Sequence, residues 1–146
     1  MKITDALLAE HLVFHNLFDH IESVAPRIQT LAEIKALADV MEKMLKAHSD
    51  TEEELFMGPL EHCFEQIGQR EMFELEHEEI DKALLLVQQS SRINKARELL
   101  LSAVASSRRH FDKEERIVFP LADRILKVET LHELGQVWID QRKEPA

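Results

Sequence analysis

Hydrophobic residues recur every three or four positions along nearly the whole chain, which is the period of one face of an α-helix. This period predicts long amphipathic helices, and the breaks between them fall at Pro, Gly and Ser. We expect helices over about 4–25, 30–58, 69–89 and 95–127, and a shorter one over about 129–141. Residues 58–69 are expected to form a connector between the second and third helices.

Residues with known preferences for helix ends support these boundaries. Pro26 is expected to close the first helix, and the capping box Thr30-Leu-Ala-Glu33 is expected to open the second. Asn94 is the expected N-cap of the fourth helix, and Pro120 should kink that helix or separate its tail. A second capping box, Thr130 to Glu133, is expected at the start of the terminal helix.

The apolar stripes of these helices predict one core. The residues expected to face it are Leu7, Leu8, Phe14, Phe18 and Ile21, then Leu37, Met41, Met44, Leu45, Leu55 and Phe56, then Phe73, Ile80, Leu84 and Val87. Short connections place consecutive helices antiparallel, so we expect a single all-α domain over residues 1–146, an up-down antiparallel four-helix bundle with a short C-terminal helix. On that helix, Leu131, Leu134 and Trp138 either cover the end of the bundle or join two chains in a homodimer.

The acidic balance of the chain narrows the range of its partners. The 146 residues include 28 Asp and Glu against 18 Lys and Arg, a formal net charge of −10. This charge disfavours nucleic-acid backbones and anionic membrane surfaces, and no apolar run is long enough to span a bilayer. Cys63 is the only cysteine, and the first ten residues hold acids in place of a signal-peptide core. We therefore expect a cytoplasmic protein that binds neither nucleic acid nor membrane.

One polar motif occurs twice. Residues 48–55 read HSDTEEEL and residues 110–117 read HFDKEERI, so both fit H-x-D-x-E-E-x-[LI]. The other two helices each carry a Glu-His pair, Glu10-His11 and Glu76-His77. The two copies are 62 positions apart for the motif and 66 for the pair. The chain therefore reads as two helical hairpins related by an approximate two-fold axis.

The helical phase places a set of polar residues on the stripes that face the bundle axis. These residues are His11, His48, Glu52, His77, His110 and Glu114. Any one of the histidines, taken singly, is more often a hydrogen-bonded core residue than a ligand. Four imidazoles and two carboxylates in one apolar core would be very costly unless cations neutralise and coordinate them. A pair of divalent metal ions meets both requirements.

The number of ligands indicates what such a pair of ions could bind. The four histidines occupy one coordination position each, and two glutamates that bridge both metals occupy two each. On two six-coordinate metals, a bridging oxide or hydroxide then leaves room for water, a diatomic gas or peroxide. Imidazole and carboxylate ligands without thiolate suit iron, with zinc or manganese as alternatives. The pocket around the ions would be lined by Phe14, Phe18, Leu55, Phe73 and Ile117.

The order of these residues resembles a known family. His on the first helix, His-x-x-x-Glu on the second, His on the third and His-x-x-x-Glu on the fourth is similar to the hemerythrin-like, or HHE cation-binding, pattern. The resemblance covers roughly residues 1–125. It implies a non-haem di-iron centre whose ligands are His11, His48, Glu52, His77, His110 and Glu114, with the two glutamates as bridges.

Two features differ from the oxygen-carrying hemerythrins and match the bacterial HHE branch, which includes iron-centre repair proteins. Asp81 stands where the oxygen carriers have a fifth histidine, and Glu114 follows its histidine by four residues where they have Asp at five. Asp81 is a candidate further ligand or a neighbour of the ligands. His15 mirrors Asp81 in the first hairpin, and it either supplies a fifth imidazole or packs among phenylalanines with its ring N–H on Asp19.

The expected function is that of a di-iron protein that binds, senses or reacts with dioxygen, nitric oxide or peroxide. One alternative is an iron-handling or iron-centre repair protein that donates metal. Another is a metal-free helical interaction module, against which stand Glu52 and Glu114, because neither has an in-phase basic partner. No redox partner follows from the sequence.

Overall fold

The computed structural model describes residues 1–59, 61 and 70–144, with the backbone alone at 55–57. Every regular element within these residues is helical, and no strand occurs among them. Most of the connector predicted over 58–69, including Cys63, lies outside the described residues. None of the described helices is long and apolar enough to cross a membrane.

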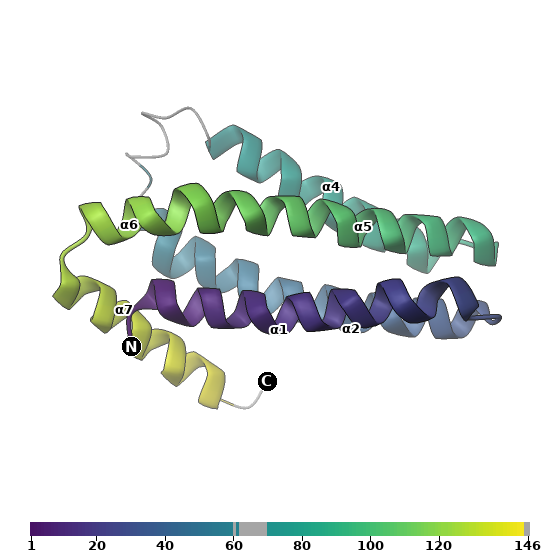
Figure 1. The fold of residues 1–146 in the computed structure, drawn as a ribbon, viewed down its shortest axis with the longest axis horizontal. Coiled ribbons are helices and arrows are strands. Elements are labelled where there is room, and N and C mark those ends of the chain that lie inside the picture. The colour runs from purple at the N-terminus through teal and green to yellow at the C-terminus, as the bar shows by residue number, and fades with distance from the viewer. Residues whose placement is uncertain (60, 62–69, 145–146) are drawn as a thin grey trace.

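The long helices form an up-down bundle. They are α1 (Ile3–Val24), α2 (Leu31–Thr51), α4 (Arg70–Gln89) and α5 (Ile93–Lys113). Figure 1 shows them side by side along the longest axis of the molecule, with α6 (Phe119–Ile125) continuing the line of α5. The last helix, α7 (Val128–Lys143), runs across the bundle beside the first part of α1. The predicted helical bundle with a short C-terminal helix is confirmed.

Local chemistry explains the first two helix boundaries as predicted. Pro26 lies in a 3₁₀ turn, η1 (Ala25–Arg27), which ends α1. Thr30 is the N-cap of α2: its Oγ1 accepts from the backbone N–H of Glu33 at 3.3 Å, and its hydroxyl donates to the Glu33 carboxylate at 2.6 Å. Pro120 occupies the first turn of α6, where its missing N–H costs no helical hydrogen bond.

Two predicted caps are wrong. The N-cap of α5 is Arg92, and the side chain of Asn94 instead accepts from Arg97 inside the first turn, at 2.7 Å. Helix α7 begins at Val128, before Thr130, and its N-cap makes no side-chain hydrogen bond. A side-chain cap contributes only about 1 kcal/mol, so the packing of a helix face can place the start elsewhere.

Each repeated motif ends in a π-helical turn, which the sequence pattern did not predict. The two turns are η2 (Glu52–Met57) and η3 (Glu114–Val118), and each begins at the glutamate of His-x-x-x-Glu. In η3 the backbone N–H of Phe119 donates to the carbonyl of Glu114, five residues earlier. The extra residue in this turn rotates the following positions. Val118 is therefore buried and Ile117 is 41% exposed, so the expectation that Ile117 faces the pocket is wrong.

The core consists of two apolar clusters with a polar layer between them. The larger cluster includes Phe14, Ile80 and Phe111, and the smaller one, beneath α7, includes Leu7 and Phe73. On α1 and on α4, one histidine separates the residues of the two clusters. The side chains of Leu55 and Phe56 lie outside the described ones, and the rest of the predicted stripes are buried in most positions. Leu8 is an exception at 41% exposure, because it lies beside the stripe and faces outward.

Candidate metal centre

Each of the four long helices and both π-turns contribute a side chain to the polar layer. His11 lies on α1, His48 near the end of α2, Glu52 at the start of η2, His77 on α4, His110 on α5, and Glu114 at the start of η3. Five of these six side chains are buried, and only His77 is half-buried. The fold therefore brings together all six residues that the helical phase placed on the core stripes.

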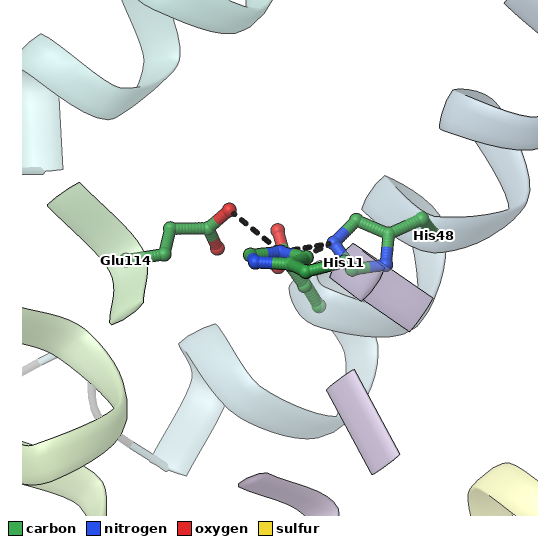
Figure 2. A group of neighbouring side chains, drawn as sticks. His11, His48 and Glu114 are labelled. Carbon is green, nitrogen blue, oxygen red and sulfur yellow. Dashed lines mark hydrogen bonds and ion pairs between the residues drawn. The ribbon is translucent and has the colours of Figure 1, made fainter. Parts of the chain in front are cut away.

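One group of potential ligands comes from the first hairpin and both glutamates. His11, His48, Glu52 and Glu114 each offer an atom, and these atoms lie within 4.8 Å of one another. Nε2 of His11 is 3.1 Å from Nε2 of His48 and 3.5 Å from Oε1 of Glu114. Figure 2 shows the three side chains directed toward one another. Nε2 of His48 is in turn 2.9 Å from Oε1 of Glu52.

A second group comes from the other hairpin. His77, His110 and Glu52 also offer atoms within 4.8 Å of one another. Nε2 of His77 lies 2.7 Å from Nε2 of His110, which is 3.3 Å from Oε1 of Glu114. Glu52 therefore belongs to both groups, and Glu114 faces a histidine from each hairpin.

The spacing and burial of these atoms fit a pair of metal ions. Two donors about 2.1 Å from one ion and at right angles to each other lie about 3 Å apart. The separations of 3.1 Å between His11 and His48 and 2.7 Å between His77 and His110 are close to that value. Buried atoms without a hydrogen-bond partner among the described residues include Oε1 of Glu52 and Oε1 of Glu114. Buried carboxylate oxygens are costly unless a donor or a cation satisfies them.

The electrostatics of the metal-free layer point the same way. Burial and the charge of Glu52 raise the pKa of Glu114 well above its usual range. Against burial, His48, Glu114 and His110 together lower the pKa of Glu52. Burial and the neighbouring His48 lower the pKa of His11 to about 3. Against burial, Glu52 and Glu10 raise the pKa of His48 to about 9. Protons on Glu114 and His48 thus balance the layer, and bound cations would replace them.

Carboxylates outside the six-residue set lie beside Nδ1 of three of the histidines. Glu76 lies 2.9 Å from Nδ1 of His110 and Glu115 lies 3.2 Å from Nδ1 of His11, and such hydrogen-bonded partners hold the ring and its tautomer so that Nε2 faces the ligand. Glu10 lies 3.5 Å from Nδ1 of His48, an ion-pair distance, and this nitrogen has no hydrogen-bond partner among the described residues. The helical phase alone does not assign these roles, although the repeated Glu-His pair and the second Glu of the motif at 110–117 carry the signal for them. Among the described residues, no carboxylate lies within 4.0 Å of a ring nitrogen of His77.

His15 and Asp81 lie outside both groups. The His15 side chain is 32% exposed, and its Nδ1 accepts from Arg108 at 3.1 Å. Arg108 also donates to Asp19 at 2.6 Å, so the contact expected between His15 and Asp19 is replaced by one through Arg108. Asp81 is exposed and lines a groove beside His77.

Solvent reaches the layer beside His77. An open groove of about 590 Å³ runs between α2 and α4, and its described lining includes Glu53, Glu74, His77, Glu78 and Asp81. A second hollow of about 370 Å³ shares Glu53, Glu74 and His77 with it. The His77 side of the layer therefore faces acidic, open surface, whereas the His11 side is enclosed.

The comparison with protein families agrees with this geometry. The family model of the hemerythrin HHE cation-binding domain matches residues 2–122. The chain belongs to this family. No curated protein and no solved structure matches it significantly. All six residues of the polar layer lie inside the matched part of this hemerythrin-like chain, and α7 lies beyond it.

Proposed function

We propose that this hemerythrin-like protein holds two iron ions in the polar layer and binds or reacts with dioxygen, nitric oxide or peroxide there. Its ligands would be His11, His48, Glu52, His77, His110 and Glu114. The observation that carries the proposal is the place of Glu52, which lies within reach of the histidines of both hairpins. A carboxylate in that position can bridge two ions, and imidazole with carboxylate is a ligand set that suits iron.

The bound iron would supply the redox chemistry, and the chain supplies position and enclosure. Glu76 and Glu115 hold two imidazoles by hydrogen bonds so that Nε2 points into the layer, and Glu10 faces a third, that of His48, at an ion-pair distance. Aromatic rings exclude water on the enclosed side: the His11 ring stacks on Phe111 at 3.9 Å between centroids and tilts against Phe119 at 5.2 Å. The groove beside His77 would admit a small ligand.

The first test is the metal content and the visible absorption of the purified protein, before and after anaerobic reduction. About two irons per chain, with absorption bands that bleach on reduction and return with dioxygen or nitric oxide, would support the proposal. Two zinc ions per chain and no visible absorption would support the metal site but refute the redox function. An intact helical protein that binds no metal would refute the whole proposal.

Glu52 and its neighbour provide a matched pair of variants for the bridging role. Glu52→Ala should lose both ions, because the carboxylate belongs to both groups. Glu53→Ala removes the adjacent, exposed carboxylate, which belongs to neither group, and should retain both ions. Full metal content in Glu52→Ala, measured by elemental analysis, would exclude the bridge.

Iron handling is the second candidate, and the open acidic groove beside His77 favours it. Acidic residues attract cations to that opening, and a half-buried ligand releases an ion more readily than an enclosed one. The two candidates predict different fates for the metal. A donor should transfer iron to an apo-acceptor faster than to a chelator of equal affinity, whereas a gas-binding protein should retain both ions through repeated oxidation and reduction.

A further inference from the structure

Helix α7 packs closely against the N-terminal part of α1. Leu131 is 1% exposed within the smaller apolar cluster, and Leu134 and Trp138 pack against the same cluster. The backbone of Met1 lies against Gly135, where any Cβ would collide with it. Of the two roles considered for this stripe, covering the bundle end is the one these contacts show. The tight contact also holds α7 in a defined position along α1.

Two polar side chains of α7, those of Trp138 and Arg142, contact the carboxylate of Glu10. The indole N–H of Trp138 donates to Oε1 of Glu10 at 2.7 Å, and Arg142 donates to Oε1 at 3.1 Å and to Oε2 at 3.2 Å. The Arg142 guanidinium also lies over the Trp138 ring, 5.6 Å from its centroid. Two side chains of α7 thus fix both oxygens of a carboxylate that is only 20% exposed.

Glu10 connects α7 to the polar layer. Its Oε1 lies 3.5 Å from Nδ1 of His48, an ion-pair distance, and this nitrogen has no hydrogen-bond partner among the described residues, so the Glu10 carboxylate acts on the ring through its charge. Nε2 of the same ring is 2.9 Å from Glu52. The His48 side chain is 1% exposed, so solvent contributes little to its orientation. A continuous series of contacts therefore runs from Trp138 and Arg142 through Glu10 to a ring that faces the candidate metal.

The other hairpin performs the corresponding task without α7. Glu76 holds Nδ1 of His110 at 2.9 Å, and the ammonium of Lys113, one turn further along α5 itself, pairs with Glu76. Among the described residues, no Lys or Arg of α2 forms an ion pair with Glu10, and Trp138 and Arg142 of α7 take that place. The two halves therefore use the same carboxylate-histidine pair but anchor it from different parts of the chain.

We propose that α7 is a positioning element for the His11/His48 half of the metal centre: Trp138 and Arg142 fix Glu10, and Glu10 fixes the ring of His48. The inference rests on the proposed metal-binding role of His48. It predicts that residues beyond the matched family domain control how firmly one of the two ions is held, while the other ion is controlled by Lys113.

The test is the release of iron from each half of the centre. Anaerobically loaded Fe(II) protein is mixed with a chromogenic chelator, and the time course is resolved into two phases. In the Trp138→Phe/Arg142→Gln variant one phase should become about tenfold faster, which is the usual loss when the partner of a metal-ligating histidine is removed. Lys113→Gln should accelerate the other phase. The single variant Arg142→Lys leaves Trp138 unchanged and keeps a cationic donor near Glu10. It should therefore release iron at the wild-type rate.

A control variant separates positioning from the docking of α7. Gln141 joins α7 to α2 through Thr51 at 3.4 Å and to η2 through Glu54 at 3.3 Å but does not contact Glu10, so Gln141→Ala should leave both phases unchanged. Equal acceleration by Gln141→Ala, or no change in the Trp138→Phe/Arg142→Gln variant, would overturn the inference. If that double variant does not fold, judged by circular dichroism, Arg142→Gln alone keeps the Trp138 packing and tests the same contact. Wild-type protein that takes up no iron would instead refute the proposed function itself.

Discussion

The two hairpins carry the same ligand pattern, yet His11 and His48 of the first are 0% and 1% exposed, whereas His77 of the second is half-buried beside an open groove. Glu115 holds His11 from η3 at 3.2 Å. By symmetry Glu53 would hold His77 from η2, but Glu53 is exposed and lines the groove. The two hairpins therefore carry the same types of ligand, but the first hairpin encloses its histidines more completely than the second. Of the two ions proposed for this layer, one should therefore be retained and the other accessible.

Removing one histidine from each half should produce the largest contrast. His77→Ala should leave one ion in the enclosed half, held by His11 and His48, and that ion should resist a chelator. His11→Ala should leave one ion in the open half, and that ion should be lost quickly. Metal content before and after dialysis against a chelator measures both effects. Greater retention in His11→Ala would reverse the proposed order of the halves.

Removing both ions should lower stability and should affect the second hairpin more. At metal concentrations about 100 times the dissociation constant, each bound ion stabilises the fold by about 2.7 kcal/mol, so losing both ions should lower the melting temperature by about 10–20 °C. Amide hydrogen exchange should increase more in α4 than in α1, because no carboxylate among the described residues holds the ring of His77. Thermal unfolding and exchange of the two forms check this, and equal protection of both helices would argue against the asymmetry.

The mirrored glutamates of the two motifs should differ in effect. Glu115→Gln weakens the partner of His11 and should reduce metal affinity in that half by about tenfold, or about 1.4 kcal/mol. Glu53→Gln alters a carboxylate that does not contact His77 and should leave affinity within about twofold of wild type. Competition titration with a chelator measures both. Comparable losses in the two variants would show that Glu53 holds His77 in solution.

The smallest expected effect tests the π-turn at the end of α5. Val118 is 1% exposed, so Val118→Ala should cost about 1–2 kcal/mol of unfolding free energy through the cavity it leaves. Ile117 is 41% exposed, and Ile117→Ser should remain within about 0.5 kcal/mol of wild type. Denaturant unfolding of the two variants compares them. A larger loss of unfolding free energy at Ile117 than at Val118 would contradict the π-turn. It would indicate that the α-helix continues without interruption, as the sequence predicted.

Local periodicity was sufficient to predict which residues gather in the core. His11 lies between Leu7 and Phe14 in helical phase, and the structure buries all three. The same reasoning failed at Ile117, because a π-turn adds a residue without changing the pattern of residue types. It also failed at Asn94 and Thr130, where a favourable cap residue was present but the helix began earlier.

The sequence by itself therefore determined the helical class, the two hairpins and the set of side chains in the polar layer, since each depends on spacing within one helix. Only the tertiary structure decided which partners those side chains meet. Glu115 reaches His11 from another helix, and Trp138 reaches Glu10 from α7, 128 residues away. Such contacts depend on how far one helix is rotated and shifted against the next. The packing of whole faces sets that arrangement, and the period of a single segment does not contain it.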